Sequence, residues 1–341
     1  MPENPEAAAV SCGFARFIVS REQAGQRLDR FLTSQLREMS RTRIQSLVEG
    51  GRVRVDGIAR KPSFRVAPGE TVVVEIPPAP PPGVEAEEIP FEVLYEDEDV
   101  AVVNKPAGMI VHPGAGADRG TMVSALLYRF GGMEGLSGVG GPLRPGIVHR
   151  LDKGTSGALV IARTNAAHLK LVEEFRKRLI EKTYLALLHG KIKGEAGTVE
   201  LPVARDLRCR TRMTARRREG REARTDWRVC MRLGGFTLIE AGLHTGRTHQ
   251  IRVHFSALGC PVVGDTLYGA PRQERAGSKL LPPLGRNFLH ASRIAFTHPR
   301  TCWRMEVRAP LPRELASYLN DLAQATKTDS GSIDAALQKF L

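Results

Sequence analysis

A run of prolines near residue 80 limits what this chain can fold into. Residues 77–83 read PPAPPPG, so five of these seven positions are proline. Proline lacks a backbone N–H and has a fixed φ, so the segment cannot continue a helix or a central strand, and such segments form stiff, extended linkers. Since 341 residues also exceed one small domain, we expect two folded units. Their expected limits are a loose leader at 1–15, a small domain at 16–76, a linker at 77–88, a larger domain at 89–325 and a tail at 326–341.

The segment before the linker has the pattern of a small mixed domain. Leu28, Phe31, Leu32 and Leu36 recur at the spacing of one helix face. A second helix is expected after Ser40, whose hydroxyl can cap the free N–H groups of its first turn. The segments RFIVS, RVRVDG and TVVVEI predict short strands around these two helices.

The segment after the linker is rich in apolar runs. DVAVVNKP, GALVIAR, TYLALLHG and FTLIE each predict a strand, Thr164 can begin a helix, and a last helix is expected after Pro312. Because helices and strands do not alternate strictly, we expect an α+β domain with a mostly antiparallel sheet, rather than a doubly wound fold. Residues 131–146 contain seven glycines and predict a flexible loop.

The charge balance indicates a polyanionic partner. Fifty Lys and Arg against 37 Asp and Glu give a formal net charge of +13 and a sequence pI of about 9.9. Nucleic acid is the usual partner of such a field, and a merely soluble basic protein is the alternative. Ten arginines and four acids lie within residues 205–228, which favours contact with phosphates over a solvated surface.

Cysteine usage and the N-terminal residues bear on the cellular compartment. The five cysteines form no C-x-x-C pair, which disfavours a disulfide framework and a Cys-rich zinc site and fits a reducing cytosol. The first 16 residues lack a basic segment followed by a long apolar core, so we expect no secretory signal. No apolar run approaches membrane-spanning length. We therefore expect a cytoplasmic protein without a membrane partner.

Two segments contain the residues best suited to chemistry. In GIVHRLDKGTSG, Asp152 lies on a turn after an apolar run, between the cations Arg150 and Lys153. In LHTGRTHQIRVHFSALG, Arg247 directly precedes a helix that we expect Thr248 to cap. A cation beside the free N–H groups of a helix N-terminus can form an anion site.

Other interpretations of these segments are weaker. His249 and His254 are about 140° apart on a helix, so they do not share a face for a metal ion. DKGTSG lacks the spacing of a phosphate-binding loop. A glycoside hydrolase would need a second acid near Asp152, and the motif offers none. The acidic run YEDED at 95–99 is expected to be a solvated turn.

Together the motifs resemble a known family. GIVHRLDKGTSG is similar to the signature of the RluA-type pseudouridine synthases, and EKTYLALLHG, LHTGRTHQIRVH and NKPAGMIVHPGAG resemble the family's other core segments. The segment GQRLDRFLTSQLREMSRTRIQSLVEGGRVRVDG is similar to the small S4 RNA-binding domain, and the resemblance extends over roughly residues 16–312. One departure is Gly154, where many members have an acidic residue; we expect it to change the turn more than the chemistry.

The resemblance implies an isomerase that needs neither a cofactor nor a metal. The N1–C1′ bond of a uridine is broken, the base rotates, and a C5–C1′ bond is made. By the resemblance Asp152 is the catalytic aspartate, Arg247 pairs with it, and Tyr184 stacks on the displaced base. Arg150 would enter the space that the flipped uridine leaves. Attack at the sugar, attack at the base and a glycal route all remain open.

The resemblance also implies RNA as the partner. The S4 segment contains four arginines suited to the phosphate backbone, namely Arg41, Arg43, Arg52 and Arg54. By this resemblance, an S4 domain combined with VHPGAG indicates that the substrate is a stem-loop of large-subunit (23S) ribosomal RNA with several uridines in its loop. We expect the protein to act as a monomer. The same reaction at other ribosomal or transfer RNA sites is an alternative. Another is a non-catalytic S4-containing ribosome-assembly factor, against which the intact catalytic set counts.

Overall fold

The chain divides into two folded units, Met1–Pro82 and Gly83–Leu341, in the computed structural model. The structure describes residues 13–36, 39, 41–76, 83–114, 118–209, 211–215, 219–328 and 337–338, without the side chains of residues 41–43. Ser40, the linker prolines and most of the expected leader and tail therefore lie outside the described residues. Each unit has its own hydrophobic core.

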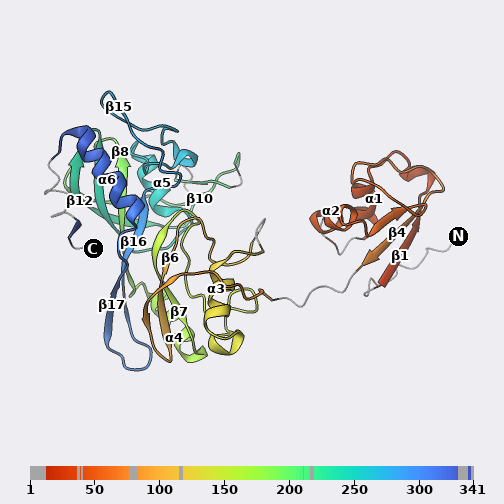
Figure 1. Cartoon of the computed structure of the whole chain (residues 1–341), viewed down its shortest axis with the longest axis horizontal. Coiled ribbons are helices and arrows are strands. Elements are labelled where there is room, and N and C mark those ends of the chain that lie inside the picture. The colour runs from red at the N-terminus through yellow and green to blue at the C-terminus, as the bar shows by residue number, and fades with distance from the viewer. Residues whose placement is uncertain are drawn as a thin grey trace. The chain divides into compact units, whose positions relative to one another are not determined.

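In the first unit two helices accompany a small antiparallel sheet (Figure 1). Its elements are β1 (Gly13–Ile18), a 3-10 turn (Arg21–Gln23), α1 (Leu28–Gln35), α2 (Arg41–Glu49), β2 (Val53–Val55), β3 (Ile58–Ala59) and β4 (Thr71–Ile76), with strand order β1-β4-β2-β3. The predicted apolar face of α1 is confirmed, since Leu28, Phe31, Leu32 and Leu36 are at most 1% exposed.

The second unit is built on one nine-stranded sheet. Along the sheet the order is β5 (Glu92–Glu96), β6 (Val100–Lys105), β7 (Ser156–Ala162), β16 (Leu289–Thr297), β8 (Glu181–His189), β13 (Phe236–Leu243), β12 (Arg224–Leu233) and β9 (Ala196–Glu200), with β17 (Arg304–Arg308) also paired to β16. Only the β7–β16 pair is parallel among these strands. The prediction of an α+β fold with a mostly antiparallel sheet is confirmed.

Helices cover both faces of this sheet where β6 and β7 lie. The helices of the unit are α3 (Met122–Arg129), α4 (Asn165–Lys177), α5 (Gln250–Ala257) and α6 (Arg313–Thr326). In β7, Leu159 belongs to the core that contains α3, and its neighbour Val160 belongs to the core that contains α4. Successive strand residues point to opposite faces, so the continuous apolar run GALVIA is buried along its whole length. None of the described helices is long and apolar enough to cross a membrane.

The cap of α4 and the glycine-rich segment 131–146 have different outcomes. Thr164 does cap α4, and its hydroxyl accepts a hydrogen bond from the Ala167 N–H at 3.2 Å. Residues 131–146, expected as a flexible loop, are instead anchored to the end of β7. The Ser137 N–H donates to the Ala162 carbonyl at 3.1 Å, and the Ala162 N–H donates to the Gly146 carbonyl at 2.9 Å. This anchored segment leads directly into the turn that contains Asp152.

Candidate active site

A pocket of about 500 Å³ in the second unit brings together the residues that the motifs single out. Asp152, Tyr184, Arg247 and Arg150 all line it, although they come from three separate parts of the chain. Asp152 precedes β7, Tyr184 lies within β8, and Arg247 lies between β13 and α5. The neighbouring strands β7, β16 and β8 thus bring distant motifs to one end of the sheet.

A buried lysine holds the turn that contains Asp152. Lys105, at the end of β6, is fully buried and donates from Nζ to the carbonyls of Pro106 at 2.7 Å and Met109 at 2.8 Å. The carbonyl of Lys153 lies 3.5 Å from the same Nζ. Burial, followed by the charge of Arg286, lowers the pKa of Lys105 to about 7. The Lys105 amino group therefore fixes the backbone directly after Asp152.

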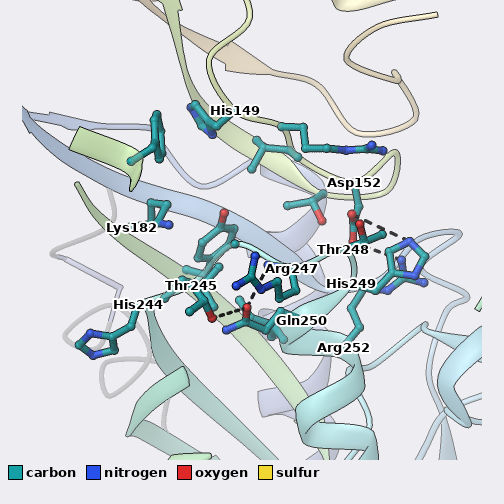
Figure 2. Close-up of a pocket in the computed structure, with 18 of the residues that line it drawn as sticks. His149, Asp152, Lys182, His244, Thr245, Arg247, Thr248, His249, Gln250 and Arg252 are labelled. Atoms are coloured by element: carbon teal, nitrogen blue, oxygen red, sulfur yellow. Dashed lines mark hydrogen bonds and ion pairs between the residues drawn. The ribbon is translucent and has the colours of Figure 1, made fainter. Parts of the chain in front are cut away.

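The cation that pairs with Asp152 is Arg252, so the predicted Arg247–Asp152 pair is wrong. Arg252 Nη1 lies 3.3 Å from Asp152 Oδ2, and the same guanidinium forks onto Asp265 at 2.6 and 2.9 Å. Arg247 lies next to Gln250 instead, and its Nε donates to the Glu222 carbonyl at 3.0 Å (Figure 2).

The helix start explains this difference. The N-cap of α5 is His249 in a left-handed conformation (φ 57°), not Thr248 as expected. The helix therefore begins later than predicted, and Arg252 lies in its first turn. Both arginines stand in the motif GRTHQIRVH, and sequence spacing alone could not tell which of them reaches Asp152. His249 also faces the carboxylate, with Nε2 3.9 Å from Asp152 Oδ1.

Tyr184 and Lys182 lie two positions apart on β8, so both point to the pocket side of the strand. Tyr184 is 7% exposed. Burial and then the charge of Asp152 raise the pKa of its phenol, which keeps the ring neutral. Burial lowers the pKa of Lys182 to about 8. Lys182 forms no hydrogen bond or ion pair with any described residue, although its Nζ lies 5.6 Å from the ring centre of Phe175.

His149 and Arg150, which precede Asp152 in the chain, also line the pocket. The His149 ring packs against Phe175 at 4.9 Å between centres, and its Nε2 accepts a hydrogen bond from the Val160 N–H at 2.9 Å. Burial, followed by the charge of Lys182, lowers the pKa of His149 to about 3, so the ring is neutral. Arg150 is exposed and has no ionic partner within the described part of the chain. The exposed guanidinium of Arg150 is therefore available to bind a flexible polyanion.

The predicted RNA-binding arginines of the first unit are only partly described. Arg52 pairs with Glu75. Arg54 is exposed and lies 3.4 Å from the Gly57 carbonyl. The side chains of Arg41 and Arg43 lie outside the described residues, although both begin α2.

The basic segment 205–228 is less free than its composition suggests. Its described part forms a hairpin of β10 (Ala204–Arg205) and β11 (Met213–Thr214), and then the start of β12. Arg224 lies 3.3 Å from both Glu200 and Asp226, and Arg228 lies 3.2 Å from Glu240. Carboxylates on β12 itself and on its neighbours β9 and β13 thus neutralise part of the positive charge.

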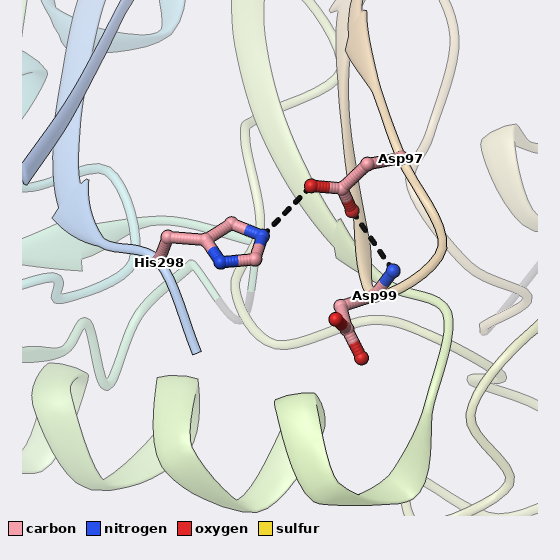
Figure 3. Close-up of side chains that lie close together, drawn as sticks. All are labelled: Asp97, Asp99 and His298. Carbon is pink, nitrogen blue, oxygen red and sulfur yellow. Dashed lines mark hydrogen bonds and ion pairs between the residues drawn. The ribbon is translucent and has the colours of Figure 1, made fainter. Parts of the chain in front are cut away.

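The acidic run at 95–99 is solvated only in part, since Glu96 and Glu98 are exposed whereas Asp99 is buried, so the prediction of a solvated turn is wrong for Asp99. Asp97 accepts a hydrogen bond from Tyr95 at 2.7 Å. It also accepts one from His298 Nε2 at 2.8 Å (Figure 3). Asp99 is 7% exposed and pairs with Arg300. Asp97, Asp99 and His298 are close enough to suggest a metal site. Because a neighbouring cation and several donors already occupy their oxygens, the cluster instead ties the β5–β6 turn to the end of β16.

Comparisons with known proteins identify the family. The family described as RNA pseudouridylate synthase matches residues 99–257, and the S4 domain matches residues 26–72. The chain is 42% identical to the RNA pseudouridine synthase YlyB of Bacillus subtilis, over 89% of this chain and 96% of YlyB. It is 40% identical to ribosomal large subunit pseudouridine synthase D of Zymomonas mobilis, over 87% of this chain and 94% of that protein.

A solved structure agrees with this assignment. The human RNA pseudouridylate synthase domain containing 1 matches with a TM-score of 0.52 and 30% identity, over 72% of this chain and 97% of that structure. The chain therefore belongs to the RNA pseudouridine synthase family and is an isomerase, with an S4 domain ahead of its catalytic domain.

Proposed function

We propose that Asp152 is the catalytic carboxylate of this synthase and that Arg252 holds it in place. The observation that carries the proposal is that Asp152 is the only carboxylate among the described residues lining the pocket. Its side chain is 16% exposed, so a substrate can still reach it. A carboxylate can act as a covalent nucleophile or take a proton in glycosidic chemistry.

The other pocket residues receive roles that fit their positions. The neutral ring of Tyr184 is a stacking surface for the uracil that leaves its helix. Arg247 lies beside Thr245 and Gln250 and is a cation for the RNA backbone rather than the partner of Asp152. Arg150, exposed and unpaired among the described residues, can follow the displaced nucleotide and occupy its place.

Substitution of Asp152 by Asn tests this proposal. We expect Asp152→Asn to abolish release of tritium from RNA labelled at uridine C5, because the shape of the pocket is kept and the nucleophilic charge is removed. RNA affinity should change little. Asp118→Asn, at an exposed position outside the pocket, is the matched control and should retain full activity. Turnover by Asp152→Asn at more than a few per cent of the wild-type rate would refute the assignment.

We propose a stem-loop of large-subunit ribosomal RNA as the substrate, with several uridines modified in one loop. Relatives from Zymomonas, Xanthomonas and Haemophilus are named for that subunit, at 38–40% identity. An S4 domain and the hairpin β10–β11 give two basic surfaces for a large folded RNA. Mapping pseudouridines in unmodified large-subunit RNA and in bulk transfer RNA after incubation tests this. Preferred modification of transfer RNA would contradict the proposed substrate and leave the reaction unchanged.

The predicted domain limits, the monomeric state and the cytoplasmic location stay predictions of the sequence. Sedimentation of the free protein and of its RNA complex would test the monomeric state directly.

A further inference from the structure

A buried tyrosine outside the pocket connects the basic hairpin to the residues around Asp152. Tyr268 lies in the 3-10 turn Thr266–Tyr268 and is 2% exposed. Its Oη accepts a hydrogen bond from the Met213 N–H of the hairpin at 2.8 Å. The same Oη lies 2.7 Å from His249 Nδ1. One hydroxyl therefore touches both the hairpin and the N-cap residue of α5.

The ring of Tyr268 also lies against two arginines. The guanidinium of Arg252, which pairs with Asp152, lies 4.8 Å from the ring centre. The guanidinium of Arg212, in the hairpin, lies 5.4 Å from the ring centre. Arginines attract aromatic faces electrostatically. Tyr268 also forms an apolar cluster with Val253 of α5, against which Met213 packs. The hairpin is therefore seated on Tyr268 by a hydrogen bond, a cation–π contact and apolar packing.

The hydrogen-bond inventory leaves the phenolic proton of Tyr268 available for His249. A phenol has one proton and can accept through its oxygen lone pairs. Since the Met213 N–H already donates to Oη, the phenolic proton is free to donate to His249 Nδ1. His249 then has its own proton on Nε2, the atom that faces Asp152 Oδ1 at 3.9 Å. Burial, partly offset by Asp152, lowers the pKa of His249, which keeps the ring in this neutral form.

We propose that Tyr268 is a positioning residue that links the position of the hairpin to Asp152. It does so by fixing the tautomer and orientation of His249. The hairpin contains the exposed arginines Arg205 and Arg208. RNA bound to them therefore contacts the element that is hydrogen-bonded to Tyr268. The proposal rests on the proposed function, in which Asp152 is the catalytic carboxylate. It assigns to residues outside the pocket the task of presenting an N–H to that carboxylate.

Substitution of Tyr268 by Phe removes the hydroxyl and keeps the ring beside its two arginines. We expect the single-turnover rate of Tyr268→Phe at saturating RNA to fall about tenfold, with RNA affinity changed less than about twofold, because small errors of alignment act on the chemical step. Tyr318→Phe is the matched control, because Tyr318 is similarly buried and its hydroxyl has no hydrogen-bond partner among the described residues. It should retain the wild-type rate.

Nitrogen NMR of the histidine rings gives a readout that a merely structural role would not move. In the wild-type protein His249, assigned by its absence from the spectrum of His249→Gln, should be protonated at Nε2. In Tyr268→Phe its Nδ1 has no donor, and the ring should shift toward the Nδ1–H form. The double variant His249→Gln/Tyr268→Phe should be no slower than His249→Gln, because Tyr268 acts through His249.

The outcomes separate the two proposals. If Asp152→Asn is inactive while Tyr268→Phe is as fast as the wild type, or if His249 of the wild type is protonated at Nδ1, the role of Tyr268 is refuted and that of Asp152 stands. If Asp152→Asn retains turnover, the catalytic assignment itself is refuted. A slower Tyr268→Phe with a changed His249 tautomer and an unchanged Tyr318→Phe supports the coupling.

Discussion

Arg252 bridges two carboxylates that are both largely hidden from water. Its side chain is 12% exposed, and those of Asp152 and Asp265 are 16% and 2% exposed. The planar guanidinium can fork onto Asp265 while one nitrogen still reaches Asp152, and the point charge of a lysine cannot match that geometry. The orientation of Asp152 therefore depends on Asp265, a residue outside the recognised motifs.

Substitution of Arg252 is expected to damage chemistry, and substitution of Arg247 is expected to damage binding. Arg252→Lys keeps the charge without the fork, so we expect turnover to fall about 10- to 100-fold with little change in RNA affinity. Arg252→Ala should also destabilise the fold by about 3–5 kcal/mol, since two buried carboxylates are left without their cation.

Arg247→Lys should mainly change RNA affinity. Single-turnover kinetics and RNA titrations check both, and a larger fall in turnover for Arg247→Lys would reverse the assignment.

Lys105 gives the stability of the protein a specific pH dependence. Its pKa is about 7 in the folded chain and about 10.4 in an unfolded one. Between these values the unfolded chain binds the extra proton, so the free energy of unfolding rises with pH. Relative to Lys105→Met, the wild type should gain roughly 2 kcal/mol between pH 7 and pH 9. Urea unfolding at both pH values measures the difference; an equal pH dependence of the two proteins would contradict it.

At the scale of elements, the packing of the turn after Asp152 accounts for Gly154, the glycine that departs from the family pattern. A Cβ on Gly154 would lie 2.4 Å from Asn287 Oδ1. Asn287 is 6% exposed, and its side-chain amide has no hydrogen-bond partner among the described residues. The asparagine fills the space that a side chain at position 154 would occupy. Glycine at this position therefore fits the packing of the turn, and the expectation that the chemistry at Asp152 is unaffected stays a prediction.

This packing makes a prediction about paired substitutions. Gly154→Ala should destabilise the protein by about 1–3 kcal/mol, because the new methyl group overlaps Asn287. Gly154→Ala/Asn287→Ala should recover most of that stability, since the second substitution removes the overlapping amide. Chemical denaturation of the two single variants and the double variant gives the coupling energy. Additive effects would show that the two positions do not share this space.

Elements with a strong local signal could be predicted from the sequence, and contacts between distant segments could not. The run GALVIA and the cap at Thr164 are both local, and both are confirmed. The start of α5 differs from its prediction because its cap is a histidine in a left-handed conformation, which composition does not indicate. The partner of Asp152 lies one hundred residues away, so it depends on where α5 begins. The hydrogen-bonded position of Asp97 depends on His298, two hundred and one residues away.

At the scale of the whole molecule, the positive charge is divided between two units with separate cores. In the second unit several arginines of the basic segment are paired with acids. The density of arginines at 205–228 therefore overstates how many of them are free to bind RNA. The S4 domain of the first unit covers residues 26–72.

Deletion of the first unit tests this division. A chain that starts at Gly83 should keep its fold, because among the described residues no core residue of the second unit lies before that position. Its RNA affinity should fall, and its salt dependence should weaken by about 0.7–0.9 in slope for each phosphate group that the first unit binds. Slow isomerisation of the target loop should remain. Binding titrations over a range of salt concentrations measure the slope, and an unchanged slope would assign the first unit another task.

The parallel pair β7–β16 has a consequence for how the enzyme forms. Strands β5, β6 and β7 come from one stretch of chain and the remaining strands from another. Within the described strands, His290–Ser156 and Ala291–Gly157 are the pairs that join them in register. A Cβ on Gly157 would lie 2.2 Å from the Ala291 carbonyl, so this junction requires glycine. Pairing over such a sequence separation is slow, because the chain gives up loop-closure entropy before the strands stabilise each other. Asp152 and Tyr184 lie on opposite sides of that junction, so during refolding the return of catalytic activity should report the last kinetic step.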